Sequence, residues 1–300
     1  MKALVTGASS GIGKDMARYL SQLGYDLVLV ARTEQKLLDF QKELKTNVQI
    51  LPMDVSKIEN CKMIFEQAKD VDIVINNAGF GAFGEFTKTE LETELHMIDT
   101  NIVAVHVLTK LFLKEMEKKN KGYILNVASI AGFMPGPLMA TYYATKSYIV
   151  RLTEAIRIEL EKRNSNVSIS ALCPGPVNTE FNRVANVKFA VKALSSEYVA
   201  KYAIDKMFQK KLVIIPSFKI KAVKQLTRFG SDKLTARIAY HMQKRKEKAN
   251  TPFPNILDII LLIFNTFSYQ IYKFFTRYSS CFSLPKLTIT YSIVFYFFIS

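Results

Sequence analysis

The chain has 300 residues, 49% of them hydrophobic, which is enough to bury one large core and excludes a wholly disordered protein. Its three cysteines and three histidines are widely spaced, so we expect no disulfide framework, no metal site and a reducing cytoplasm. The N-terminus lacks the apolar core and cleavage site of a secretory signal, so we expect no export. The net charge of +15 is uneven, because residues 1–181 are neutral whereas residues 182–248 hold 17 basic and 4 acidic side chains.

Short β-branched runs alternate with longer amphipathic stretches as far as about residue 215. This alternation predicts an α/β protein, a three-layer doubly wound Rossmann fold with a mostly parallel sheet of about seven strands, followed by a basic helical C-terminal extension. The predicted strands cover residues 3–5, 26–30, 48–51, 73–75, 123–127, 167–172 and 212–215. Predicted helices, apolar at three- and four-residue spacing, include residues 14–23, 34–44, 102–119 and 142–161.

A glycine-rich turn, Thr6-Gly-Ala-Ser-Ser-Gly-Ile-Gly13, follows the first predicted strand and opens a helix. Its glycines let the backbone approach a pyrophosphate, and the helix N-terminus offers N–H donors and partial positive charge. Because the spacing is GxxxGxG rather than GxGxxG, a tight strand–helix connection without a ligand is the alternative. The predicted cofactor contacts here are Thr6, Gly7, Ser9, Ser10, Gly11, Ile12 and Gly13.

The end of the second predicted strand indicates which cofactor binds. An Asp or Glu at this place would select NAD by binding the ribose 2′-hydroxyl, but the chain has Ala31 followed by Arg32. An arginine holds a 2′-phosphate through its planar donor fork, so we expect NADP(H), with NAD(H) as the alternative cofactor. A surface arginine without a ligand is the other interpretation.

A third set of residues suggests acid–base chemistry. Tyr142 and Lys146 lie four residues apart on a predicted helix and share one face, and a neighbouring ammonium lowers the pKa of a phenol toward neutrality. Tyr142 then becomes a usable general acid. Ser129 follows a strand, where its hydroxyl could bind a carbonyl oxygen. Tyr143 has Ser147 rather than lysine four residues on and fails this pairing.

The last third of the chain changes character. We divide the sequence into a Rossmann domain (1–217), a basic helical extension (218–249) and an aromatic, apolar tail (250–300). The tail's two apolar runs are shorter than the roughly 18–20 residues of a membrane-spanning helix, so we expect interfacial contact with an anionic membrane surface through residues 201–300. No nucleic-acid-reading motif accompanies the lysines, so no nucleic acid is expected. The alternatives are a solvated helical face and a tail without function.

Together these residues resemble the short-chain dehydrogenase/reductase family, in its single-domain NADP(H)-preferring form, over about residues 1–215. The matching motifs occur in the family's order, and no catalytic position is missing. They are the glycine-rich turn, Asn76-Asn-Ala-Gly79, Asn101, Ser129, Tyr142-x-x-x-Lys146 and Pro174-Gly-Pro-Val177.

The resemblance implies a role for each matching position. Tyr142 would be the acid in reduction and the base in oxidation, with Ser129 orienting the reacting oxygen. Lys146 would bind the nicotinamide ribose and tune Tyr142, and Asn101 would hold a proton-relaying water. The implied cofactor contacts further along the chain are Asp54 and Val55 at the adenine, Asn77, Ala78 and Gly79 at the cofactor floor, and Pro174, Gly175, Val177 and Thr179, of which the last two would fix the carboxamide.

The expected substrate is apolar, because the segment that closes the pocket in this family, about residues 181–194, is apolar here, and because residues 76–84 resemble the hydroxysteroid and 3-oxoacyl reductase branch. We therefore expect NADPH-dependent reduction of a ketone or oxoacyl group in a cytoplasmic, peripherally membrane-associated enzyme. The alternatives are NAD(P)⁺-dependent oxidation of a secondary alcohol and a membrane-surface protein that senses cofactor without turnover. The resemblance also implies a homodimer or homotetramer built through residues 102–119 and 142–161.

Overall fold

The computed structural model describes residues 1–181, 193–227 and 232–245. The chain divides into two compact units, Met1–Phe253 and Pro254–Ser300, and every described residue belongs to the first. The apolar tail that the sequence distinguishes at residues 250–300 therefore lies outside the described residues.

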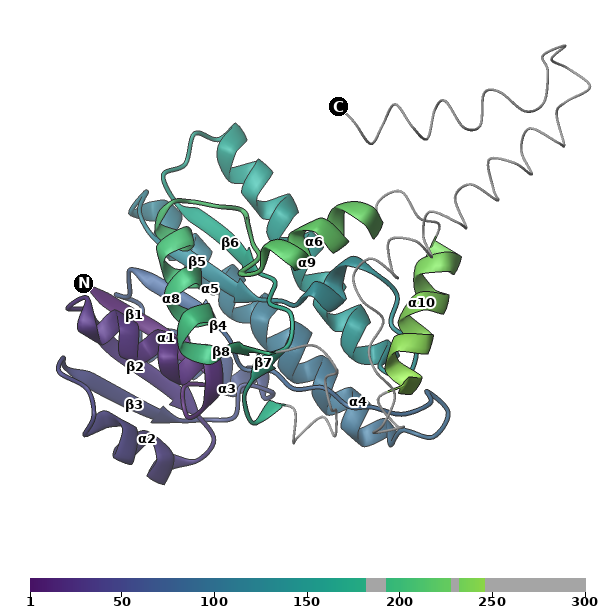
Figure 1. The fold of residues 1–300 in the computed structure, drawn as a ribbon. Coiled ribbons are helices and arrows are strands. Elements are labelled where there is room, and N and C mark those ends of the chain that lie inside the picture. Colours follow the sequence, from purple (N-terminus) through teal and green to yellow (C-terminus); the bar gives the residue numbers. More distant parts are fainter. Residues whose placement is uncertain (182–192, 228–231, 246–300) are drawn as a thin grey trace, which may run out of the picture. The chain divides into compact units, whose positions relative to one another are not determined.

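A seven-stranded parallel sheet forms the centre of the first unit, in the order β3-β2-β1-β4-β5-β6-β9 (Figure 1). The chain runs outward from β1 to β3 and returns to β4 on the other side of β1, which creates a topological switch point at the carboxyl ends of β1 and β4. The predicted Rossmann fold is thus confirmed. The strands are β1 (Lys2–Thr6), β2 (Asp26–Ala31), β3 (Val48–Pro52), β4 (Ile73–Asn76), β5 (Tyr123–Val127), β6 (Ser168–Leu172) and β9 (Val213–Ile214).

Helices cover both faces of this sheet. A separate two-stranded parallel pair, β7 (Val177–Asn178) and β8 (Leu194–Ser195), lies outside the main sheet. The helices are α1 (Gly11–Gln22), α2 (Glu34–Gln41), α3 (Ile58–Gln67), α4 (Leu91–Ile98), the π-helix η1 (Asp99–Val103), α5 (Ala104–Lys118), the 3₁₀ turn η2 (Ile130–Phe133), α6 (Ala140–Lys162), α8 (Ser196–Phe208), α9 (Phe218–Thr227) and α10 (Asp232–Arg245).

All four predicted helices differ from the structure by one to three residues at one or both ends, and two of the differences have a clear local cause. The helix predicted over 34–44 ends at Gln41, because Glu43 and Leu44 form turn bonds to residues three positions earlier; Leu44 still packs on the core, which is why the apolar pattern continues through it. The first two residues of the helix predicted over 102–119 belong to the π-helix η1, which begins at Asp99 directly after α4, so the helical segment begins before residue 102.

The two faces of the sheet bury separate apolar clusters, because alternate side chains of a strand point to opposite sides. In β1, Ala3 and Val5 join the cluster that includes side chains of α1, α2 and α8, whereas Leu4 joins the cluster that includes side chains of α3 and α5. Layers of helix, sheet and helix result (Figure 1).

The basic extension is helical over its described residues, as α9 and α10, and both helices contact the Rossmann domain. Ile220 of α9 fills the space above Gly175, and Gln243 of α10 donates a hydrogen bond to Tyr143 of α6. Within the described ranges, no helix combines the length and apolar character needed to cross a bilayer.

Candidate active site

The glycine-rich turn lies at the switch point, between β1 and α1. Gly7 and Gly11 adopt φ of +65° and +56°, a region that side chains with a Cβ rarely enter. A Cβ at Gly13 would collide with the Asn77 amide and lie 2.5 Å from the Gly7 carbonyl oxygen. Asn77 donates to the carbonyl oxygens of Thr6 and Gly7 at 3.0 and 3.2 Å, which ties the end of β4 to the turn.

This turn fits a dinucleotide pyrophosphate. Ser10 precedes α1 in an extended conformation, and its hydroxyl makes no capping bond, so the first N–H groups of the helix have no side-chain cap. Thr179 lies against the same place, since a Cβ at Gly11 would be 3.2 Å from the Thr179 side chain. The turn thus brings together residues from three of the expected cofactor segments.

The residues expected to contact the adenosine half lie at the ends of β2 and β3. Arg32 is exposed directly after β2, while Asp54 is half-buried and Val55 is buried after β3. Burial opposes ionisation of Asp54, but hydrogen bonds from Ser56 and the positive charge of Arg32 lower its pKa below the usual value. Arg32 therefore lies near enough to Asp54 to lower the pKa of its carboxyl group.

Asn101 lies in the π-helix η1 and is fully buried. Its amide accepts a hydrogen bond from the Phe80 N–H at 3.1 Å and donates to the Phe80 carbonyl at 2.9 Å and to the Thr145 hydroxyl at 3.1 Å. Single-turn π-helices occur frequently at functional sites. Here the wider turn places one amide between the loop after β4 and helix α6.

Ser129, Tyr142 and Lys146 meet between β5 and α6. All three are buried, with 8%, 9% and 5% of their surfaces exposed. The Ser129 hydroxyl interacts with the Tyr142 phenol and accepts a hydrogen bond from the Ala131 N–H at 3.1 Å. Lys146 Nζ lies close to the loop after β4, because a Cβ at Gly79 would be 3.3 Å from it. The structure thus gathers all four predicted catalytic residues.

The expectation that the Lys146 ammonium lowers the pKa of the Tyr142 phenol is wrong. Burial raises the pKa of Tyr142 above its ordinary value, and the interaction with Ser129 opposes this rise without cancelling it. Burial also lowers the pKa of Lys146 to about 8. The Lys146 ammonium lies 5.8 Å from the centre of the Tyr142 ring and donates to the Val127 carbonyl at 2.9 Å, so desolvation of the phenol dominates.

Apolar side chains surround the Tyr142 phenol ring. Its ring centre lies 5.4 Å from that of Phe181, and a Cβ at Gly81 would lie 3.1 Å from the Tyr142 ring. The expected pocket-closing segment continues from Phe181, but its residues 182–192 lie outside the described residues. The cluster around Tyr142 consists of Met97, Ala131 and Met139, with partly buried Phe80, Ala82, Phe83, Tyr143 and Phe181.

Besides Asn76, which belongs to a predicted motif, polar residues of this region contribute that were not predicted from the sequence. Asn76 donates to Asn126 at 2.8 Å, and Asn126 donates to Thr153 at 3.1 Å, which joins β4, β5 and α6 beneath the site. A polar Asn126 inside an apolar strand was the available signal. Nothing in the local pattern pointed to Thr145 or to Gln243 of the extension.

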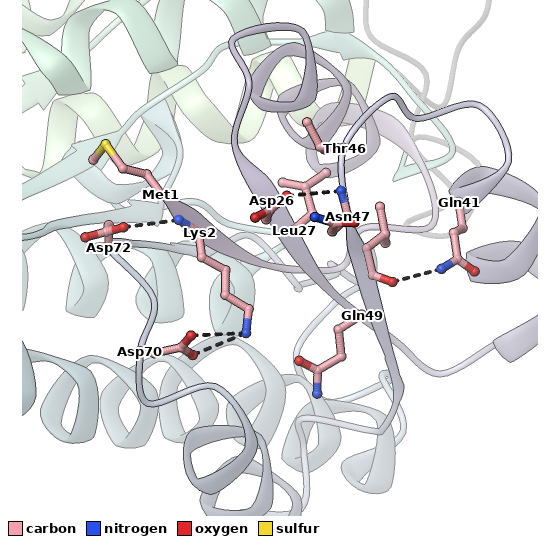
Figure 2. A pocket seen from close by; sticks show the side chains of 11 residues that line it. Met1, Lys2, Asp26, Leu27, Gln41, Thr46, Asn47, Gln49, Asp70 and Asp72 are labelled. Carbon is pink, nitrogen blue, oxygen red and sulfur yellow. Dashed lines mark hydrogen bonds and ion pairs between the residues drawn. The ribbon is translucent and has the colours of Figure 1, made fainter.

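An open groove of about 810 Å³ lies at the opposite end of the sheet, where β1, β2 and β3 begin (Figure 2). Its acidic residues are paired: Asp72 accepts from the Lys2 N–H, Asp70 binds the Lys2 ammonium and Asp26 accepts from the Asn47 N–H. Because the glycine turn and Tyr142 lie at the carboxyl ends of the strands, we assign this groove no part in the chemistry.

Comparisons with known proteins agree with this geometry. The family model described as short chain dehydrogenase matches residues 1–189. The chain belongs to the short-chain dehydrogenase family. It is 36% identical over 181 residues to an uncharacterized oxidoreductase of Staphylococcus epidermidis, covering 59% of this chain and 78% of that protein. It is 30% identical over 186 residues to a 3-oxoacyl-[acyl-carrier-protein] reductase of Rickettsia prowazekii, covering 62% and 76%.

Solved structures of the family superpose on the same fold. A short-chain dehydrogenase from Sphingobium yanoikuyae in complex with NADPH aligns with a TM-score of 0.69 and 27% identity, covering 76% of this chain and 92% of that one. One from Burkholderia phymatum in complex with NAD aligns with a TM-score of 0.69 and 25% identity, covering 75% and 91%. This family member is therefore an NAD(P)-dependent oxidoreductase that acts on alcohol or carbonyl groups of small molecules.

Proposed function

We propose that this enzyme uses NADPH to reduce a ketone or oxoacyl group on an apolar substrate. The observation that carries the proposal is the surroundings of Tyr142: a buried phenol beside the Ser129 hydroxyl, enclosed by methionine and phenylalanine side chains. A polar substrate would lose its hydration there without gaining hydrogen-bond partners, whereas an apolar one gains from burial.

The chain's own residues supply the proton and the orientation. When bound, the nicotinamide supplies the hydride. Tyr142 holds its proton at neutral pH, and burial raises its pKa further; it donates that proton to the oxygen of the carbonyl group as the hydride arrives at the carbon. Ser129 orients the same oxygen. Proton donation leaves Tyr142 as a phenolate, and the Lys146 ammonium, which is charged below its pKa of about 8, compensates that negative charge.

The second candidate is the reverse reaction, oxidation of a secondary alcohol, in which the same Tyr142 would accept the proton that it donates in reduction. Reduction is preferred on the cofactor, because Arg32 supports NADPH as the hydride donor. The third candidate, a cofactor-sensing surface protein, has no use for a phenol buried beside a serine and a lysine.

Arg32 supports NADPH as the cofactor, because it offers an exposed guanidinium at the end of β2, where the chain has no acidic residue. The substrate class is supported by the relative from Rickettsia prowazekii, a 3-oxoacyl-[acyl-carrier-protein] reductase, and by the apolar wall around Tyr142.

The test is a cofactor-oxidation screen with NADPH and NADH in parallel, against ketones, aldehydes and oxoacyl thioesters of graded chain length. We expect turnover with NADPH that improves as the apolar part of the carbonyl compound grows. Turnover confined to small hydrophilic carbonyls would contradict the substrate class. Cofactor binding without turnover of any carbonyl or alcohol would favour the sensing function.

We also propose that the extension binds an anionic membrane surface, because α10 presents the exposed cations Lys233, Arg237 and Lys244. Flotation with anionic vesicles, comparing the full chain with one ending at residue 248, tests how much the tail contributes to membrane binding. Equal recovery of both proteins with the vesicles would show that the tail is not an anchor.

We further propose a homodimer or homotetramer built through α5 and α6. It is supported by the exposed Tyr148 and Ile158 on α6 and is tested by light scattering.

A further inference from the structure

Three residues among those of helix α10 whose side chains are described form a buried stripe. Thr235, Ala239 and Gln243 follow one another at four-residue spacing, so they share one face, and 7%, 4% and 3% of their surfaces are exposed. The two small residues of this stripe allow the helix to approach the domain closely. A glutamine is rarely so buried unless its amide is used.

The amide of Gln243 binds the tyrosine next to the proposed proton donor. Its Nε2 donates a hydrogen bond to the Tyr143 hydroxyl at 2.8 Å. The Tyr143 ring lies directly over Gly136, where any Cβ would collide with it. The Tyr143 and Tyr142 rings are nearly perpendicular, with centres 6.2 Å apart, and Tyr143 belongs to the apolar cluster around Tyr142.

A second contact fixes the start of the extension independently. In α9, Ile220 fills the space above Gly175, which follows β6, and the Lys224 ammonium lies 4.3 Å from the centre of the Phe133 ring in η2. The extension therefore meets both segments that border the site: the one after β6 and the one between Ser129 and α6.

We propose that Gln243 is a positioning residue that determines substrate specificity: it holds the Tyr143 ring as one wall of the apolar pocket, so the extension sets the size of the carbonyl compound that fits. This inference rests on the proposed function and deepens it. Because the Tyr143 hydroxyl is engaged by Gln243, the Tyr142 hydroxyl remains the phenol directed to the substrate oxygen. A wall built from a helix outside the Rossmann core also suits an elongated apolar substrate that extends beyond the core's own pocket.

The test compares Gln243→Leu, Tyr143→Phe and the double variant in the full chain, with NADPH and a long-chain and a short-chain ketone. Gln243→Leu removes the amide donor from the buried Tyr143 hydroxyl and Tyr143→Phe removes the acceptor, whereas the double variant removes both halves of the hydrogen bond. We expect the KM for the long-chain ketone to rise about five- to tenfold in Gln243→Leu, kcat to change less than about twofold, and the double variant to recover most of the loss. His241→Gln, at an exposed position of α10, is the matched control and should change neither.

Two results would overturn the inference. The first is a lower melting temperature of the single variants with an unchanged KM for both ketones, which is what a purely structural bond gives. The second is additive effects in the double variant. If Gln243→Leu does not fold, Tyr143→Phe, which removes only a hydroxyl, is compared with the wild type for the KM of the two ketones instead. A wild-type enzyme inactive on all carbonyl compounds would instead overturn the proposed function, and this inference with it.

Discussion

Lys146 lies one helical turn after Tyr142 on α6, yet its ammonium is held by the strand opposite, through the Val127 carbonyl. The charge is near the phenol ring without contacting its oxygen. Desolvation therefore affects both groups more strongly than their mutual electrostatic interaction does. It raises the pKa of Tyr142 and lowers that of Lys146.

Removal of the Tyr142 hydroxyl should lower turnover without weakening NADPH binding. In Tyr142→Phe we expect kcat to fall by about 10²- to 10⁴-fold, the usual contribution of a positioned general acid, with NADPH affinity kept. Steady-state turnover and fluorescence titration with NADPH measure the two effects. Tyr148→Phe, an exposed tyrosine of the same helix, is the control and should retain activity. Unchanged turnover in Tyr142→Phe would refute its role as the proton donor.

Replacement of Lys146 should make the protein more stable but inactive. In the folded protein the pKa of Lys146 is about 8, whereas an unfolded lysine has a pKa of about 10.4. Between these values the unfolded chain binds more protons, so stability rises with pH, and the cost of burying the ammonium is fully present below pH 8. Lys146→Met should therefore raise the free energy of unfolding at pH 7, by on the order of 2 kcal/mol after loss of the Val127 hydrogen bond.

The same gain should shrink as the pH rises above about 8, because both states of the wild type hold a neutral lysine only above about pH 10.4. Urea unfolding of wild type and Lys146→Met at pH 7 and pH 10 measures the difference in their free energies of unfolding. Tyr142 is present in both proteins, so its own titration cancels in this difference. An equal stability difference at the two pH values would show that desolvation of Lys146 is not the cause.

Arg32 should decide between the two nicotinamide cofactors. In Arg32→Ala we expect the KM for NADPH to rise about 10- to 100-fold, as for a lost charge-assisted hydrogen bond, while the KM for NADH changes little. Lys36→Ala removes another exposed cation from the neighbouring α2 and serves as the control. Equal increases for both cofactors would mean that Arg32 does not contact the 2′-phosphate.

The glycine turn should tolerate no added carbon at its third glycine. A Cβ at Gly13 would meet the Asn77 amide and the Gly7 carbonyl, so Gly13→Ala should abolish dinucleotide binding and cost about 1–3 kcal/mol of stability. Gly24→Ala is the comparison: no atom lies within 4 Å, but its φ of +86° makes the change cost about 1–2 kcal/mol with cofactor binding kept. Isothermal titration with NADPH, alongside urea unfolding, would detect retained binding in Gly13→Ala.

Much of the fold and of the site follows from local pattern. Alternating β-branched runs and amphipathic stretches predict the parallel sheet, because strand and helix periodicities are short-range properties. The glycine turn and the Tyr142 and Lys146 pair were equally accessible, since each lies within eight residues and one helical turn or tight connection places its members together.

The sequence by itself determined which residues could share a helix face or a strand end, because backbone geometry alone sets those distances. Only the tertiary structure decided the direction of the Tyr142 pKa shift, which depends on burial by side chains from several elements. It alone placed Asn101 in a π-turn between Phe80 and Thr145, and Gln243 against a tyrosine 100 residues earlier. Contacts across such separations are set by how whole elements pack, and no local periodicity encodes them.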